Sequence, residues 1–300
     1  MRFKLILLFI FFTLLFLFYP GDTHYFHIFA FNKETFNQVE KNSQYTVRPI
    51  PYLKSNYFPE ISAEGIYVAD LDSFTPILKR NEHQQFLPAS TTKIITALVA
   101  VDNAKPDDII TVKRPISEGQ VIGLVRDEKL TLENLLFGLL VYSGNDAAYV
   151  IADNFGFDHF ITLMNQKAKD LHMIDSHFSN PAGLDDYAQL TTPYDLALAS
   201  RELLKNKLLS RVVSTRDITI SDVDFKYFHR LTNVNKLLGE IQGLGGLKTG
   251  YTENAGENLV SFYKHNGHQF VMVVLKSADR FTDTKNLVTW MNDNVDFITP

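Results

Sequence analysis

The 300-residue chain contains no cysteine, which excludes thiol nucleophiles, thiolate metal sites and disulfides. It also has no excess of positive charge, because 29 lysines and arginines face 34 aspartates and glutamates, for a formal net charge of −5. Nucleic-acid phosphates are bound by basic faces, so we expect no nucleic-acid partner. With 45% hydrophobic residues spread along its whole length, the chain is predicted to form a globular domain.

The N-terminus has the pattern of an export segment. Arg2 and Lys4 precede an almost unbroken apolar run over 5–19, which Pro20 closes. As a helix this run would span roughly 22 Å, less than the ~30 Å hydrocarbon core of a bilayer, which favours a cleaved signal peptide. No small-x-small cleavage site follows the run, which favours an uncleaved membrane anchor. Both alternatives stay open, and both place the rest of the chain on the extracytoplasmic side of the membrane.

Three regions are predicted along the chain. Residues 1–21 form the signal peptide or N-terminal anchor, and residues 61–300 form the folded domain. Between them, residues 22–60 are rich in aromatic and polar residues and contain three prolines. Proline limits regular structure, so this segment is predicted to be a spacer. The alternative is an additional strand that packs on the domain.

Within the domain, strands are predicted at both ends and helices between them. Hydrophobic patterns and turn residues predict strands at 64–70, 75–78, 244–251, 258–264 and 269–276. Asn266-Gly267 predicts a tight hairpin between the last two strands. Helices are predicted from residue 88 onward and at 131–140, 146–153, 157–171, 192–203 and 283–297. Strands from both ends that complete one sheet predict an α+β fold.

Ser90 and Lys93 place a hydroxyl and an amine one helical turn apart on the same face of a predicted helix. A serine hydroxyl is a weak nucleophile and needs a base, and lysine can serve only when its pKa is lowered. At the start of the helix, backbone N–H groups would also point toward a developing oxyanion. The spacing alone is weak support, because Ser261 and Lys264 repeat it within a predicted strand, where residues three apart face opposite sides.

Two further motifs follow in order along the chain. Ser143-Gly144-Asn145 lies between two predicted helices and taken alone would be a helix cap. Lys248-Thr249-Gly250 lies on a predicted strand and taken alone would be a strand end. The glycines of this strand, among them Gly245 and Gly246, weaken it, and they are interpreted as a place where a substrate backbone approaches closely.

Ser-x-x-Lys, Ser-x-Asn and Lys-Thr-Gly in this order resemble the three motifs of penicillin-binding enzymes and serine β-lactamases. More closely, Pro88-Ala89-Ser90-Thr91-Thr92-Lys93-Ile94 is similar to the first motif of the low-molecular-mass D-alanyl-D-alanine carboxypeptidases, peptidase family S11. The segments 143–148, 180–184, 232–238 and 246–252 also resemble this family. The resemblance implies an antiparallel sheet with a helical subdomain, and it makes 61–300 the catalytic domain of a DD-peptidase.

The resemblance also implies the roles of individual residues. Ser90 would attack the carbonyl between two D-alanines of a peptidoglycan stem peptide, and Lys93 would take its proton. Ser143 would relay a proton to the leaving amine, and Asn145 would position Lys93 and the substrate. The substrate carboxylate would be bound by Lys248, Thr249 and Gly250, with Lys248 also lowering the Lys93 pKa through charge repulsion. The backbone N–H groups of Ser90 and Tyr251 would form the oxyanion hole, and Tyr251 stands where many relatives have histidine.

The family implies no cofactor, and β-lactams would be covalent inhibitors that leave a long-lived adduct on Ser90. His24/His27 and His265/His268 have the spacing of metal ligands, but they lie in the spacer and beside a turn, so no metal site is expected. The leading hypothesis is a serine DD-carboxypeptidase that trims the terminal D-alanine. The alternatives are a DD-endopeptidase that cuts cross-links, a serine β-lactamase and a catalytically silent envelope protein. Because the chain ends soon after its last predicted helix, attachment to the membrane is expected through the N-terminal segment.

Overall fold

The computed structural model describes residues 2–17 and 49–298. The chain divides into two compact units, 1–47 and 48–300, which are treated separately. In the first, the described part is helix α1 (Arg2–Leu17), whose large apolar side chains from Phe3 to Phe16 are exposed. None of the helices in the described ranges is both long and apolar enough to cross a membrane. The signal or anchor over 1–21 stays a prediction, and its last four residues lie outside the described residues, as do residues 22–48 of the predicted spacer.

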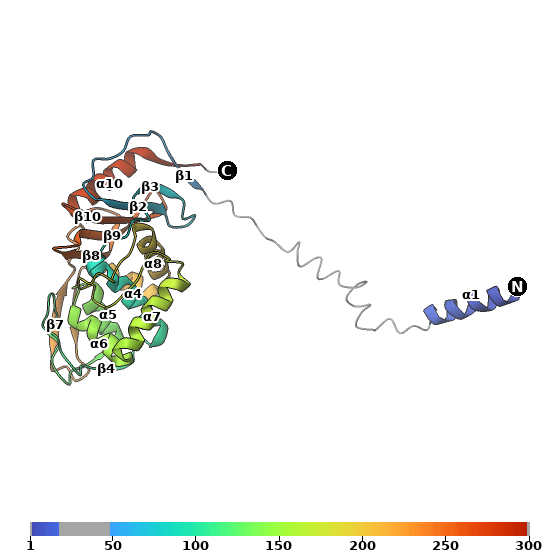
Figure 1. The fold of residues 1–300 in the computed structure, drawn as a ribbon, viewed down its shortest axis with the longest axis horizontal. Helices are drawn as coiled ribbons and strands as arrows, with labels where there is room; N and C mark the ends of the chain where they lie inside the picture. Colours follow the sequence, from blue (N-terminus) through green and yellow to red (C-terminus); the bar gives the residue numbers. More distant parts are fainter. Residues whose placement is uncertain (1, 18–48, 299–300) are drawn as a thin grey trace. The chain divides into compact units, whose positions relative to one another are not determined.

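The second unit contains a five-stranded antiparallel sheet in the order β3-β2-β10-β9-β8 (Figure 1). Its strands are β2 (Gly65–Asp70), β3 (Pro76–Arg80), β8 (Leu244–Thr252), β9 (Gly256–His265) and β10 (His268–Ser277). The N-terminal hairpin joins the C-terminal strands because β2 pairs with β10. The predicted sheet and the predicted α+β fold are therefore confirmed.

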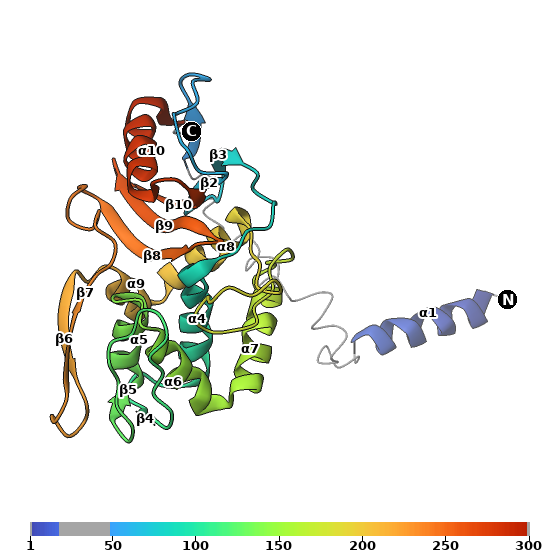
Figure 2. The ribbon, with the colours of Figure 1, turned by 60° about the vertical axis from the view of Figure 1, so that its left-hand side comes forward.

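Helices cover both faces of this sheet, so its strands are apolar on both sides. Along β2, Ile66 and Val68 belong to a core with α10 (Arg280–Asn294), whereas Tyr67 and Ala69 belong to the core on the helical side. Figure 2 shows α10 on one side of the sheet and the other helices on the opposite side. These are η1 (Ala89–Thr92), α4 (Lys93–Asn103), α5 (Leu132–Leu140), α6 (Asn145–Phe155), α7 (Phe157–Asp170), α8 (Pro193–Lys205) and α9 (Lys207–Val213).

Local signals predicted the ends of several elements correctly. The Thr131 side chain accepts a hydrogen bond from the backbone N–H of Asn134 and so caps α5, as predicted. Pro193 is the first residue of α8, where its missing N–H is not needed. Asn266 and Gly267 both have positive φ, 49° and 81°, as a two-residue hairpin turn requires.

The C-terminus differs from the prediction of one helix over 283–297. Helix α10 ends at Asn294, and β11 (Val295–Ile298) then pairs antiparallel with β1 (Ile50–Leu53). The Trp290 indole also donates to the carbonyl of Tyr57 at 2.7 Å. From residue 50 onward, the predicted spacer thus packs on the domain as an additional strand, which was the alternative interpretation of this segment. A partner strand so distant in sequence leaves no local signal.

Two short hairpins were not predicted. One pairs β4 (Ile109–Thr111) with β5 (Lys129–Thr131), and the other pairs β6 (Asp217–Ser221) with β7 (Phe228–Thr232). Their strands have three to five residues and are partly exposed, so their hydrophobic alternation is too short to distinguish them from loops. The segment between β4 and β5 contributes Gly119 and Gln120 to the cleft that Ser90 lines.

Candidate active site

Ser90 lies in the single turn η1 that leads into α4, and its side chain is half-buried. Two glycines allow other segments to approach its backbone. A Cβ on Gly250 would lie 3.1 Å from the nitrogen of Ser90, and a Cβ on Gly183 would lie only 1.8 Å from the carbonyl oxygen of Ala89. Ala89 itself has a φ of +49°, a conformation that costs a residue with a side chain on the order of 1–3 kcal/mol. Tight packing therefore fixes the backbone of Ser90.

Lys93 is fully buried and reaches three oxygens. Its Nζ lies 2.8 Å from Ser90 Oγ, 2.8 Å from Asn145 Oδ1 and 2.7 Å from the carbonyl of Ala182. Burial lowers the pKa of Lys93 to about 7, although the negative charge of Asp146 opposes this shift. Near neutral pH a large share of Lys93 is consequently the free amine.

A free amine has two N–H donors and one lone pair, and the surroundings of Lys93 match this set. Asn145 Oδ1 and the Ala182 carbonyl are acceptors only, so they take both N–H groups. The lone pair is then left for the hydroxyl of Ser90. This arrangement can remove a proton from Ser90 as its oxygen attacks an electrophile.

The carbonyl of Ala182 is held in place by a side chain of its own loop. The Oδ1 atom of Asn180 accepts hydrogen bonds from the N–H groups of Ala182, Gly183 and Leu184, at 3.2, 2.8 and 3.0 Å. This loop belongs to the segment 180–184 that resembles the family. Its contact with Lys93 was not predicted.

Ser143 and Lys248 form a second hydroxyl–amine pair, with Lys248 Nζ donating to Ser143 Oγ at 2.8 Å. Both side chains are buried, and Ser143 has a strained positive φ of 69°. A β-bulge between Gly246 and Lys248 shifts the register of β8 just before the lysine. Burial lowers the pKa of Lys248 well below its usual value, and the positive charges of Lys93 and Arg280 lower it further.

Burial is the main cause of the low pKa of both amines. The expected lowering of the Lys93 pKa by the charge of Lys248 stays a prediction.

The interpretation of the glycines changes. A Cβ on Gly245 would lie 2.0 Å from the Phe262 ring, so packing requires this glycine. Of the three glycines in β8, Gly250 is the one that lines the site.

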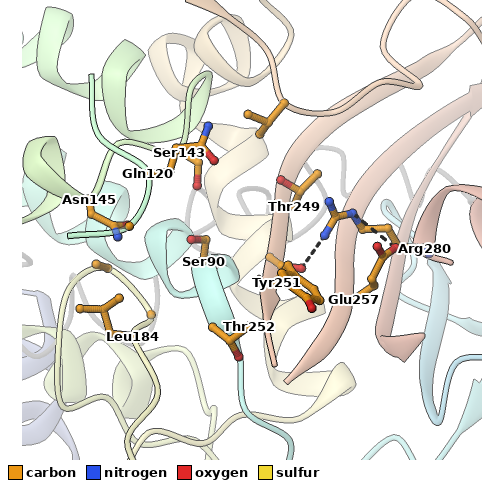
Figure 3. A pocket seen from close by; sticks show the side chains of 15 residues that line it. Ser90, Gln120, Ser143, Asn145, Leu184, Thr249, Tyr251, Thr252, Glu257 and Arg280 are labelled. Carbon is orange, nitrogen blue, oxygen red and sulfur yellow. Dashed lines mark hydrogen bonds and ion pairs between the residues drawn. The ribbon is translucent and has the colours of Figure 1, made fainter. Parts of the chain in front are cut away.

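Ser90, Ser143, Asn145, Thr249 and Tyr251 line one cleft of about 500 Å³. Figure 3 shows Ser90 near its centre, with Asn145 and Ser143 on one side and Thr249 and Tyr251 on the other. The cleft is completed by Gly119, Gln120, Ala182, Gly183, Leu184, Val234, Gly250, Thr252, Glu257 and Arg280. The structure thus brings together the residues that the three motifs predicted, while Lys93 and Lys248 lie buried behind the cleft surface.

Arg280, the first residue of α10, was not predicted as a site residue. It donates to the carbonyl of Gly250 at 2.8 Å, lies 3.9 Å from Glu257 and extends to the same cleft (Figure 3). Its guanidinium adds a cation close to Thr249 and Tyr251. A lone arginine far from the motifs gives no signal in the sequence.

The second Ser-x-x-Lys, at Ser261 and Lys264, lies on a strand, as predicted. Ser261 is buried in β9 with no hydrogen-bond partner for its hydroxyl, whereas Lys264 is exposed. No group of three or more histidine, aspartate or glutamate side chains in the described ranges could hold a metal ion. The three motifs bring two hydroxyls, two amines and one amide together at the cleft, from Ser90, Ser143, Lys93, Lys248 and Asn145.

Comparisons with known proteins agree with this geometry. The sequence profile of the D-alanyl-D-alanine carboxypeptidase family matches residues 53–279. D-alanyl-D-alanine carboxypeptidase DacD of Escherichia coli is 31% identical over 273 residues, which cover 84% of this chain and 68% of that protein. DacF of Bacillus subtilis is 31% identical over 226 residues, covering 72% of this chain and 58% of that protein.

Among solved structures, the Streptomyces K15 DD-transpeptidase superposes with a TM-score of 0.73 at 28% identity, covering 79% of this chain and 98% of that one. The range 53–279 that matches the family contains all three motifs. The chain belongs to the D-alanyl-D-alanine carboxypeptidase family, peptidase family S11.

Proposed function

We propose that the chain is a serine DD-carboxypeptidase that removes the terminal D-alanine from peptidoglycan stem peptides. The observation that carries this proposal is the environment of Lys93: a buried amine with a pKa of about 7, placed 2.8 Å from Ser90 Oγ. Its two remaining neighbours can only accept hydrogen bonds, so the free amine is oriented as a base. Family membership supplies the substrate class.

In the proposed acylation, Ser90 Oγ attacks the carbonyl carbon between the two D-alanines while its proton passes to Lys93. The oxyanion is bound by the backbone N–H groups of Ser90 and Tyr251. As the C–N bond breaks, the proton that Lys93 took from Ser90 passes through Ser143 to the leaving amine, which leaves Lys93 free for the next step; Lys248 contacts Ser143 at 2.8 Å. The products of this step are free D-alanine and an ester on Ser90.

Deacylation completes the proposed cycle. Water attacks the ester carbonyl. The hydroxyl of the water remains on the shortened peptide, and the proton of the water passes through Lys93 to the oxygen of Ser90. The terminal carboxylate of the substrate is bound before this by Lys248, Thr249 and Gly250, and the Arg280 guanidinium adds a positive charge at the same cleft. This charge favours substrates that end in a carboxylate.

A synthetic stem pentapeptide tests the proposal. The domain is expected to release D-alanine, and Ser90→Ala is expected to abolish the release. Ser261→Ala is the matched control, because it removes the serine of the second Ser-x-x-Lys, which lies within the sheet. Activity that survives in Ser90→Ala, or its absence from the intact domain, would refute the proposal. A cross-linked muropeptide dimer in the same assay detects endopeptidase activity, and a fluorescent penicillin should leave a long-lived adduct on Ser90.

We also propose that the enzyme works on the extracytoplasmic face of the membrane, held there by the N-terminal segment. This rests on Arg2 and Lys4 followed by the apolar residues of α1. Mass spectrometry of the protein from membranes distinguishes an uncleaved N-terminal anchor from a cleaved signal peptide. An intact N-terminus indicates an anchor, and loss of about the first 20 residues indicates a cleaved signal peptide.

A further inference from the structure

Asp146, the second residue of α6, is a fully buried carboxylate. It accepts hydrogen bonds from three consecutive backbone N–H groups of another segment: Ile122 at 3.0 Å, Gly123 at 2.9 Å and Leu124 at 3.1 Å. The N–H of Ala147 is a fourth donor at 2.9 Å. Hydrogen bonds to a charged acceptor are among the stronger ones in proteins, so Asp146 fixes the path of the segment 118–124.

This segment in turn holds Asn145, which is proposed to act on Lys93. The backbone N–H of Asn145 donates to the carbonyl of Gln120 at 2.7 Å, and its Nδ2 donates to the carbonyl of Glu118 at 3.1 Å. Because Nδ2 is engaged by the segment, Oδ1 is the atom that faces Lys93, at 2.8 Å. Gln120 also lines the cleft. A displaced segment would therefore change both the wall of the site and the orientation of the Asn145 amide.

We propose that Asp146 is a positioning residue for the acylation of Ser90, because it holds the segment 118–124 that orients Asn145 toward Lys93. The inference rests on the proposed role of Ser90 as nucleophile. Asp146 touches neither Ser90 nor the cleft surface, so it acts through Asn145 and the segment.

The charge of Asp146 gives a second, separable consequence. Its negative charge raises the pKa of Lys93 against the larger effect of burial. Besides Asp146, Lys248 on β8 is the charged group that interacts with Lys93, and the charges of Lys93 and Arg280 lower the pKa of Lys248. Neutralising Asp146 removes the negative neighbour and lowers the pKa of Lys93 further, so more free amine is present below neutral pH.

One other titratable pair contacts the same segment from the opposite side. His229 on β7 lies 3.1 Å, through Nδ1, from the carbonyl of Ile122 and 2.6 Å, through Nε2, from Glu128. Both residues are retained in all the variants proposed below.

The test is the rate of Ser90 acylation by a fluorescent penicillin across a pH series that spans neutrality. Asp146→Asn keeps the shape but removes the charge and one acceptor, and its plateau rate is expected to fall by about 10- to 100-fold. The acidic limb of its pH–rate profile, in which the rate rises with pH, is expected to move to lower pH. Asp146→Glu keeps the charge but changes the geometry, so its plateau should fall while its limb stays in place.

Asp283→Asn is the matched control. Asp283 is also a buried carboxylate that accepts two backbone N–H groups, from Ser62 and Ala63, but it lies on α10 on the other face of the sheet. Loss of stability alone would affect both sites, whereas plateau and limb should change only in the Asp146 variants.

Wild-type plateau and limb in Asp146→Asn would overturn the inference, as would equal changes in Asp283→Asn. Should Asp146→Asn fail to fold by circular dichroism, the Glu variant decides, and an unchanged plateau there overturns the inference. Absence of wild-type acylation would refute the proposed function instead. In that case NMR titration of the Lys93 side chain still tests the charge effect, and equal pKa values in wild type and Asp146→Asn would refute it.

Discussion

Replacing Gly183 with alanine tests whether close backbone packing positions Ser90. A Cβ at this position would lie 1.8 Å from the carbonyl oxygen of Ala89 and 2.9 Å from the nitrogen of Ser90, and ordinary contact begins near 3.4 Å. The two segments must therefore separate by about 1.6 Å, and a misplacement of about 1 Å in an active site costs on the order of 100-fold in rate. Acylation by penicillin is expected to slow at least about 100-fold.

Gly156 provides the control for this variant. Its φ of +86° is almost the same as the +85° of Gly183, yet a Cβ on Gly156 would meet no atom within 4 Å. Both alanine variants carry the strain of a positive φ, about 1–3 kcal/mol. Denaturant unfolding should record this loss in both, while the acylation rate should fall only in Gly183→Ala. Equal acylation by the two variants would refute the view that close packing against Ala89 positions Ser90.

Three further predictions concern Lys93, Arg280 and Thr131. Acylation needs the free amine of Lys93, so its rate should rise with pH, about tenfold per unit, and level off above the Lys93 pKa of about 7; a pH-independent rate below neutrality would contradict this. Arg280→Gln should raise KM for the pentapeptide about tenfold or more and leave KM for a C-terminally amidated analogue unchanged, because only the first offers a carboxylate; equal effects on both would show that Arg280 does not bind the carboxylate. Thr131→Ala should lower the free energy of unfolding by about 1 kcal/mol through loss of the α5 cap, without affecting acylation.

The three-residue spacing in a helical turn was enough to relate Ser90, in η1, to Lys93, the first residue of α4. Residues three apart lie on the same face, and the structure places their side chains in contact. Residues three apart on a strand face opposite sides, which excluded Ser261 and Lys264 as a second catalytic pair. Apolar segments bounded by turn residues likewise located the strands of the main sheet, and Asn266-Gly267 located its tightest turn.

The chemistry of the site depends on contacts that the local sequence does not contain. The amine of Lys93 meets a carbonyl 89 residues away, and Lys248 meets a hydroxyl 105 residues away. Both amines lose their ordinary pKa because packing removes water from them, and burial is a property of the whole fold. The position of Arg280 also depends on the whole fold, because the start of α10 lies beside Gly250 of β8.

The sequence by itself determined the order of the three motifs, the helix that joins Ser90 to Lys93 and the strand that carries Lys248. These features are set within a few residues of chain, where backbone geometry dictates which side chains share a face. Tertiary structure alone decided the β1–β11 pairing, the shift in β8 before Lys248 and the buried anchor at Asp146. Each of these joins segments far apart in the chain, and such contacts are selected by the packing of the complete domain rather than by any local preference.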